Sequence, residues 1–300
     1  MVRTRSVTLA ADELYVTQPS VSAALSALSK EVGVTLTERV GRNIRPSAAG
    51  DAFAPFAADV IGLLDQGSRA AREAAGAAGL ELRIAAVTTA AEYVVPPLMR
   101  AFSELRPELT LTLEVGNREH VFDRVASHEA DLAIGGRPPR EGRLEGEPFL
   151  PNPIVLITAP DDPLASERSV PVRELEDRVW LLREAGSGTR TMTEEFLASH
   201  YLRPRVLTLG SNGAIKRAAA MGLGVSLQSA SAAALELELE MLATISVPEE
   251  LPSREWFALR PALGGHREPV HHFLEFVTGE EAREALERAR LPASVSHNGG

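Results

Sequence analysis

The 300-residue sequence contains no cysteine, which excludes disulfide bonds and thiolate-ligated metal sites. It has no apolar run long enough to span a bilayer, and no apolar segment follows its basic N-terminus as in a signal peptide. We therefore expect a cytoplasmic protein without a membrane partner. Hydrophobic residues make up 44% of the chain, enough for a sizeable core, and the length suggests about two domains.

The residue sets of common enzymes are missing as well. No acid, base and nucleophile converge, and Gly186-Ser187-Gly188 lacks the lysine of a phosphate loop and the outer glycines of a hydrolase elbow. His266, His271 and His272 lie close together in sequence, but a chance surface cluster explains them better than a metal site. We therefore predict no catalytic residue, no metal site and no cofactor.

Basic charge is scarce in the chain as a whole but not at its start. The formal net charge of −10, taken alone, argues against a nucleic-acid partner. Residues 1–50, however, hold six Lys/Arg and four Asp/Glu, so they carry +2 and the other 250 residues carry −12. This division is typical of a DNA-reading end on an acidic body.

The first fifty residues contain the pattern of a helix-turn-helix. A short helix fits residues 9–14, and Thr17 can N-cap a second helix with Pro19 in its first turn. An apolar stripe at helical spacing faces inward in the second helix and consists of Val21, Leu25 and Leu28. On this pattern alone, an ordinary pair of amphipathic helices explains the residues equally well.

The other face of the second helix carries short polar side chains. Gln can bond adenine bidentately, and Ser or Thr can reach a base edge or a phosphate, as a recognition helix in a major groove requires. The candidate DNA-binding residues of this helix are Thr17, Gln18, Pro19, Ser20, Ser22 and Ser26.

A basic wing follows the helix pair and favours the DNA-binding interpretation. Gly33 ends the second helix, residues 34–39 form a candidate strand, and residues 40–46 form an arginine-containing turn. Arg39, Arg42 and Arg45 are then available for phosphates or the minor groove.

The order and spacing of these residues resemble the LysR-type transcriptional regulators over about fifty residues. The resemblance is carried by Ser6-Val7-Thr8-Leu9-Ala10-Ala11, Leu14, Thr17-Gln18-Pro19-Ser20-Val21-Ser22, Leu28, Val32-Gly33-Val34, Leu36, Arg39, Arg42 and Ser47-Ala48-Ala49-Gly50. Two features depart from the family pattern. Thr37 replaces a buried Phe, and only residues 1–5 precede Ser6, where the family has a further helix.

The resemblance implies a winged helix-turn-helix at 1–46, a linker helix at 47–78 and an effector-binding domain at 79–300. The family pairs the linker antiparallel with a second copy, and an apolar stripe at helical spacing suits this role; it consists of Phe53, Phe56, Val60 and Leu63 or Leu64. A helix packed on its own domain is the alternative. The resemblance thus implies a homodimer or homotetramer that binds double-stranded promoter DNA, with RNA polymerase as a candidate partner.

From Leu80 onward strands and helices alternate, which predicts an α/β class with a parallel, doubly wound sheet. We expect lobe I at about 79–151 and 255–291, lobe II at about 152–254, and a disordered tail at 292–300. This body resembles the type 2 periplasmic binding proteins, the fold of LysR-type effector domains. A ligand is therefore expected in the cleft, at the carboxyl ends of the strands.

Three helix starts at strand ends offer free backbone N–H groups and hydroxyls, which suit a carboxylate, phosphate or sulfate. Arg190 adds a cation able to grip an oxyanion. The candidate effector-binding residues are Thr88, Thr89, Asn117, Gly135, Ser187, Gly188, Thr189, Arg190 and Asn212. For each of them a plain helix cap or turn is the competing explanation. Residues 183–190, 209–212 and 222–225 resemble the Calvin-cycle operon and sulfur-assimilation branches of the family, which suggests an anionic metabolite.

We interpret the chain as a LysR-type regulator whose DNA binding is modulated by a small anionic effector. Two alternatives stay open. One is a cytosolic small-molecule binding protein whose DNA-binding module has decayed or is incomplete, which ligand binding without DNA affinity would favour. The other is an enzyme on the same two-lobed fold, which turnover of a bound ligand would reveal.

The departure at the N-terminus leads to one prediction. Without a further helix, Leu14, Val21, Leu25 and Leu28 lose packing partners, and deleting one large core side chain commonly costs about 2–5 kcal/mol. We expect either that the reading frame starts upstream or that residues 1–46 are loosely folded by themselves. Amide exchange tests the second outcome, since strong protection across residues 10–28 would contradict it.

Overall fold

The computed structural model describes residues 4, 6–40, 43–77, 79–139, 142–265 and 267–290. Arg42, His266 and the tail 292–300 lie outside these residues. The chain divides into two compact units, Met1–Arg69 and Ala70–Gly300. In the described part of the chain, no helix combines the length and the apolar character needed to cross a membrane.

Two helices open the first unit, α1 (Val7–Glu13) and α2 (Gln18–Val32). The Thr17 hydroxyl caps α2 by accepting from the Ser20 N–H, and Pro19 sits in the first turn. Gly33 ends α2 at a φ of 82°, in the left-handed region that disfavours residues with a side chain. Both predicted ends of this helix are therefore confirmed.

The core of this helix pair is small. It consists of Val7, Ala11, Val21, Leu25 and Ile44. The predicted apolar stripe of α2 is only partly buried, because Leu28 remains 38% exposed. The buried side chains of α1 include Ala10 and Ala11, which are too small to cover the whole stripe.

A two-stranded wing connects α2 to a long helix. β1 (Thr37–Val40) pairs antiparallel with β2 (Asn43–Pro46), and α3 (Ala48–Ala74) follows. Ser47 joins the two, since its N–H donates to the Leu36 carbonyl and its hydroxyl accepts from the Gly50 N–H, each at 3.1 Å. Gly50 packs so tightly that a Cβ there would lie 2.0 Å from the Leu36 carbonyl oxygen.

This contact predicts opposite effects for two alanine substitutions in α3. Gly50→Ala should destabilise the first unit by about 1–3 kcal/mol, because the new methyl group forces the wing away from the helix. Gly67→Ala should stabilise it by about 0.5–1 kcal/mol, because nothing lies within 4 Å of that position and alanine favours the helix. Urea unfolding of both variants measures the effects, and equal effects of the two would show that Gly50 is not packed as described.

The second unit contains a five-stranded sheet with the strand order β4-β3-β5-β12-β6. Its strands are β3 (Leu80–Val87), β4 (Leu109–Gly116), β5 (Leu132–Gly135), β6 (Leu144–Pro151) and β12 (Glu255–Pro261). β3 runs parallel to β4 and β5, whereas β12 runs antiparallel to β5 and β6. The α/β class is confirmed, but the sheet is mixed, because β12 brings the chain back from the second lobe.

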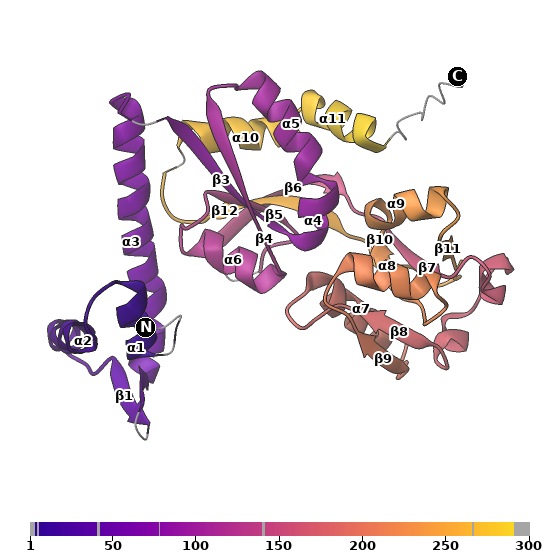
Figure 1. Cartoon of the computed structure of the whole chain (residues 1–300), viewed down its shortest axis with the longest axis horizontal. Helices are drawn as coiled ribbons and strands as arrows, with labels where there is room; N and C mark the ends of the chain where they lie inside the picture. Colours follow the sequence, from indigo (N-terminus) through magenta and orange to yellow (C-terminus); the bar gives the residue numbers. More distant parts are fainter. Residues whose placement is uncertain are drawn as a thin grey trace. The chain divides into compact units, whose positions relative to one another are not determined.

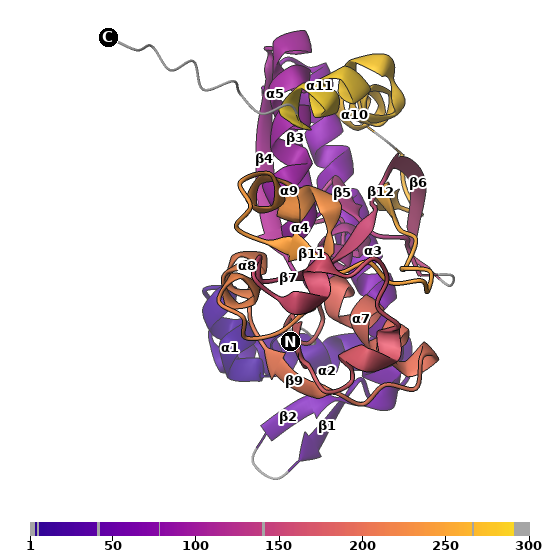
Figure 2. The same ribbon diagram turned by 90° about the vertical axis from the view of Figure 1, so that its right-hand side faces the viewer.

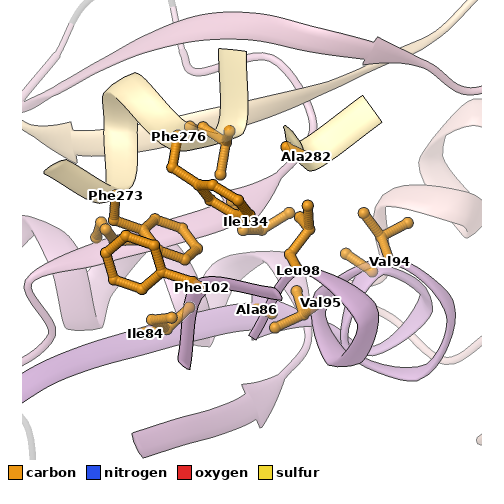
Figure 3. Packing of buried hydrophobic residues seen from close by; sticks show 14 of the residues in the cluster. Ile84, Ala86, Val94, Val95, Leu98, Phe102, Ile134, Phe273, Phe276 and Ala282 are labelled. Carbon is orange, nitrogen blue, oxygen red and sulfur yellow. The ribbon is translucent and has the colours of Figure 1, made fainter. Parts of the chain in front are cut away.

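Helices cover both faces of this sheet (Figure 1). α5 (Val95–Leu105), α10 (Glu268–Thr278) and α11 (Glu280–Arg290) share one hydrophobic cluster, and α6 (Arg118–Ala126) belongs to another. Figure 3 shows Phe102 of α5 against Phe273 and Phe276 of α10, and the Phe102 and Phe273 ring centroids are 5.0 Å apart. Alternate residues of β3 serve the two clusters, Ile84 the first and Ala85 the second.

The second lobe is built on two smaller sheets. In one, β7 (Ile154–Thr158) lies between β10 (Ser226–Ser229) and β11 (Ala243–Thr244), and in the other β8 (Val179–Leu182) pairs parallel with β9 (Arg205–Thr208). A bridge between Trp180 and Val225 joins the sheets. The remaining elements are α7 (Gly188–Ser199), α8 (Asn212–Ala220), α9 (Ala230–Glu238) and the 3₁₀ turns η1 (Pro163–Ser166) and η2 (Val172–Leu175).

Two chain segments connect the lobes, one between β6 and β7 and the other before β12. The Asn152 N–H of the first donates to the Arg254 carbonyl of the second at 2.9 Å, so the two segments are held together. The short helix α4 (Thr88–Tyr93) of the first lobe lies beside α9 of the second in both views (Figures 1 and 2). The lobes of this unit therefore meet along α4 as well as at the connecting segments.

Candidate functional site

A pocket lies between the two lobes, at the carboxyl ends of β3, β4 and β5. This inner pocket has a volume of about 30 Å³ and shares Arg118, Gly188 and Arg254 with an outer pocket of about 690 Å³. It is lined by Val87, Thr88, Thr89, Gly116, Asn117, Arg118, Gly136, Arg183, Ser187, Gly188, Thr189, Arg254 and Trp256.

Hydrogen-bond donors reach the inner pocket from the starts of helices. The Asn117 side chain caps α6 by accepting from the His120 N–H at 2.9 Å. Ser187 precedes α7, a helix of twelve residues, and its hydroxyl makes no capping bond to that helix. The first N–H groups of α7 and the Ser187 hydroxyl are therefore available to an acceptor in the pocket.

Two guanidinium groups meet beside Gly136. A Cβ on Gly136 would lie 3.2 Å from Nη1 of Arg118 and 2.8 Å from Nη2 of Arg254. Arg254 also donates to the Gly188 carbonyl at 3.3 Å. Among the residues that the structure describes, neither arginine has a carboxylate within ion-pair distance, so two like charges face the pocket together.

The surroundings of the two arginines lower the pKa values of both groups. Burial lowers the pKa of Arg254, and the neighbouring charge of Arg118 lowers it further, while Glu195 acts in the opposite direction. Burial likewise lowers the pKa of Arg118, again against the effect of Glu195. An anion placed between the two groups would favour their charged forms.

A third arginine in the pocket wall is neutralised. Arg183 donates to both carboxylate oxygens of Glu184, at 2.7 and 2.8 Å, and to Asn212 Oδ1 at 2.7 Å. Burial raises the pKa of Glu184, but the hydrogen bonds and charge of Arg183 outweigh it and hold that pKa below its usual range. Arg183 therefore has a carboxylate partner, unlike Arg118 and Arg254 in the part of the chain that the structure describes.

Six of the nine residues predicted to bind an effector line the inner pocket. They are Thr88, Thr89, Asn117, Ser187, Gly188 and Thr189. They come from three separate segments of the sequence, and the fold brings them together where the two lobes face each other. Their contact with a ligand remains a prediction.

The other three predicted residues lie elsewhere. Gly135 packs toward the side chain of Phe122 inside the lobe, and its neighbour Gly136 faces the pocket instead. Arg190 donates to Glu194 at 2.7 Å and to the Arg183 carbonyl at 3.1 Å, outside the pocket lining.

Asn212 is fully buried and links the lobes. Its Nδ2 donates to Thr89 Oγ1 at 3.1 Å and to Glu92 Oε2 at 3.0 Å, while its Oδ1 accepts from Arg183. Lys216, one turn further along α8, donates to the Tyr93 hydroxyl at 3.0 Å. Asn212 thus supports two residues of the pocket wall, Thr89 and Arg183, from behind.

The sequence analysis did not find Arg118 or Arg254. Arg118 had a usable signal, because it directly follows Asn117 at the end of β4. Arg254 had none, because it lies in an irregular segment whose position depends on the return of the chain to the first lobe.

The predicted DNA-binding residues form an exposed set in the first unit. The start of α2 is exposed to solvent and comprises Thr17, Gln18, Pro19 and Ser20. The Thr17 Oγ1 and Ser20 Oγ atoms are 2.8 Å apart. Ser26 is exposed and Ser22 half-buried. In the wing, Arg39 and Arg45 are exposed on paired strands, where Glu38 is opposite Arg45.

Comparison with family models matches both units. A model described as "LysR substrate binding domain" matches residues 75–282, and one described as "Bacterial regulatory helix-turn-helix protein, lysR family" matches residues 1–51. The chain is 34% identical over 291 residues to the RuBisCO operon transcriptional regulator of Allochromatium vinosum, which covers 94% of each chain. It is 36% identical over 224 residues to the HTH-type transcriptional activator CmpR of Synechocystis, 74% of this chain and 73% of that one.

Solved structures agree with this similarity. The regulatory domain of Synechocystis CcmR in complex with 2-PG is 36% identical, with a TM-score of 0.63, and the match covers 66% of this chain and 95% of that chain. A mutant OxyR of Corynebacterium glutamicum matches 96% of this chain and 91% of that chain with a TM-score of 0.63. Its 24% identity supports the fold alone.

Because Arg118 and Arg254 lie together without a carboxylate partner among the described residues, we expect the protein to become more stable when the charge of Arg254 is removed. Arg254→Met should raise the melting temperature of the ligand-free protein by about 2–4 °C, because it removes a buried charge that its neighbour repels. The matched substitution Arg100→Met, at a side chain that is 83% exposed, should change stability by less than about 0.5 kcal/mol. Scanning calorimetry compares the two, and a fall for Arg254→Met would show that its charge stabilises the folded state.

Proposed function

Because the chain belongs to the LysR family of DNA-binding transcriptional regulators, we propose that a small phosphorylated carboxylate, bound between its lobes, controls how it binds promoter DNA. The chain has the helix-turn-helix and the effector-binding domain of this family. The relatives it matches are regulators rather than enzymes. The cytoplasm is the place where such a regulator meets its DNA.

The meeting of Arg118 and Arg254 is the observation that carries the proposal. Two guanidinium groups without carboxylate partners suit an oxyanion, because each can donate two parallel hydrogen bonds to it. The start of α7 adds backbone N–H groups and the positive end of a helix dipole from the other lobe. The related CcmR domain was solved with 2-PG, 2-phosphoglycolate, whose phosphate and carboxylate fit this set of donors.

Such an effector acts by binding one arrangement of the protein more tightly than another. The donors of the inner pocket come from both lobes, so their geometry depends on how the lobes meet. An anion between Arg118, Arg254 and the start of α7 favours the arrangement in which these groups converge. DNA binding changes to the extent that this arrangement presents the first unit differently.

The first unit supplies the proposed DNA contacts. Gln18 at the start of α2 reads a base edge in the major groove, with Ser22 and Ser26 further along the helix. Arg39 and Arg45 of the wing hold phosphates, as does Arg42, which lies outside the described residues. The exposure of Gln18, Arg39 and Arg45 and the cap at Thr17 support the assignment.

The proposal predicts that anion binding depends on the arginine pair. At a concentration of 100 times its Kd, 2-phosphoglycolate should stabilise the protein by about 2.7 kcal/mol. Arg118→Met and Arg254→Met should each weaken binding at least about tenfold, because removing one partner of a charge-assisted hydrogen bond costs more than about 1.4 kcal/mol. Thermal-shift titrations measure the affinities.

Two further variants sharpen this test. Arg100→Met serves as the control for loss of a positive charge and should bind normally. Arg190→Met tests whether the anion binds at Arg118 and Arg254 or at Arg190, which the sequence analysis predicted. It should bind normally, because Arg190 is already paired with Glu194. Loss of binding in Arg190→Met, together with normal binding in the variants of Arg118 and Arg254, would contradict the proposed site.

The linker helix is the proposed dimer contact. Four large apolar side chains of α3 are exposed, Phe56, Val60, Ile61 and Leu64, with exposed fractions between 68% and 72%. A second copy of the helix would cover them, as is typical of the family. A patch of this kind on a single chain would otherwise promote association without a defined partner.

This contact predicts the effect of charge on oligomeric state. Val60→Glu combined with Leu64→Glu should weaken the dimer at least about tenfold, because it places carboxylates in an apolar interface. Gln66→Glu adds charge to α3 away from this face and should leave the oligomer intact. Sedimentation equilibrium measures both, and an unchanged oligomer in the double variant would place the dimer contact elsewhere.

A further inference from the structure

β3 and β5 have their carboxyl ends at the inner pocket and their amino ends on the opposite side of the sheet. β3 ends at Val87 and β5 is followed by Gly136, both of which line the inner pocket. At the other end, Glu81 lies near the start of β3 and Asp131 directly precedes β5. The two strands pair in parallel, so they form a continuous hydrogen-bonded connection between these two ends.

Arg267 connects these strand starts to the last turn of α3. Its Nη2 donates to the Asp131 carboxylate at 2.6 Å and to the Glu81 carbonyl at 3.0 Å. Its Nη1 donates to the carboxylate of Glu73, which lies in the last turn of α3. Asp131 also accepts from the Arg83 N–H of β3 at 2.8 Å. Arg267, Glu73 and Asp131 are called the clamp.

The clamp is buried, unlike the surface ion pairs of the same unit. The side chains of Arg267, Glu73 and Asp131 are 4%, 11% and 1% exposed. Buried pairs add little net stability compared with apolar residues, but losing one partner is costly, so they hold their elements in one arrangement. The clamp therefore fixes how the end of α3 attaches to the starts of β3 and β5.

We propose that Arg267 and Glu73 are positioning residues that couple the inner pocket to α3, a role that rests on the proposed function. When Arg118 and Arg254 close on an anion, the carboxyl ends of β3 and β5 shift with the pocket wall. The clamp passes that shift to the last turn of α3. Because α3 is one continuous helix from Ala48 to Ala74, it carries the change toward the wing.

Three substitutions separate this role from a merely structural one. Glu73→Ala releases α3 but leaves Arg267 bound to Asp131 and Glu81, so the sheet keeps its buried charges paired. Glu73→Gln keeps a side-chain oxygen that accepts from Arg267. Glu104→Ala is the matched control, because it removes an exposed helix glutamate that pairs with Arg100 on α5.

The test measures two affinities for each full-length variant. Fluorescence anisotropy gives the affinity for a labelled duplex from upstream of its own gene, with and without saturating 2-phosphoglycolate. Calorimetry gives the affinity for 2-phosphoglycolate itself. The ratio of the two DNA affinities is the coupling factor, which for allosteric proteins is typically about 5–150.

Wild type and Glu104→Ala should show a coupling factor in that range, and Glu73→Gln should stay within about threefold of wild type. In Glu73→Ala the coupling factor should fall to within about twofold of one, while the affinity for 2-phosphoglycolate stays within about threefold of wild type. This combination is expected only if Glu73 transmits the effect of the ligand, because a purely structural residue would weaken ligand binding or stability instead.

Other results overturn the role of the clamp. Full coupling in Glu73→Ala, equal loss in Glu104→Ala, or loss of 2-phosphoglycolate binding together with coupling would each do so and leave the inner pocket as the effector site. A wild-type protein that binds 2-phosphoglycolate but shows a coupling factor of one would also overturn the role of the clamp. If wild type binds neither 2-phosphoglycolate nor inorganic phosphate, the proposed function fails first, and the clamp has nothing to transmit.

Discussion

The guanidinium groups of Arg118 and Arg254 lie together in the inner pocket, at the carboxyl ends of β3, β4 and β5, and neighbouring residues of the second unit hold both of them there. Arg118 is held in place by the Arg137 carbonyl at 2.6 Å and by the Phe122 ring, and Arg254 by the Gly188 carbonyl. Glycine at position 136 leaves room for both guanidinium groups. Like charges side by side in a pocket repel one another, and an anion placed between them would lower that electrostatic energy.

Hydrogen bonds beside this space hold the two lobes together. The connecting segments are joined by the bond from Asn152 to Arg254, and α4 is held to α8 by Asn212 and Lys216. Arg254 thus belongs both to the connection and to the pocket. Any change in how the lobes meet would therefore move its guanidinium relative to the rest of the pocket.

The sequence predicted the local elements of the protein well, because caps and periodicity act over a few residues. Thr17 and Gly33 mark the ends of α2, and the alternation after Leu80 indicates the α/β class. β6, α9 and α11 were not predicted. β6 lies at the sheet edge with a pattern of mixed exposure, and the exposed face of α9 and the charged α11 carry little apolar periodicity.

The candidate site was predicted where it depends on strand ends and was missed where it depends on tertiary structure. Thr88 and Asn117 directly follow β3 and β4, and Ser187 lies in the turn between β8 and α7, so their convergence could be inferred from topology. Gly135 and Gly136 differ by one residue, and the twofold alternation of a strand decides which faces the pocket. Arg190 and Arg254 could be told apart only by their partners, which residues far away in sequence supply.

The most direct test of this account is a crystal structure of the full-length chain with 2-phosphoglycolate bound. The account predicts phosphate oxygens within hydrogen-bond distance of the guanidinium groups of both Arg118 and Arg254, with the start of α7 closing on the same ligand. A ligand bound at another surface, or in the inner pocket without contact to either arginine, would contradict the claim that this pair organises the effector site.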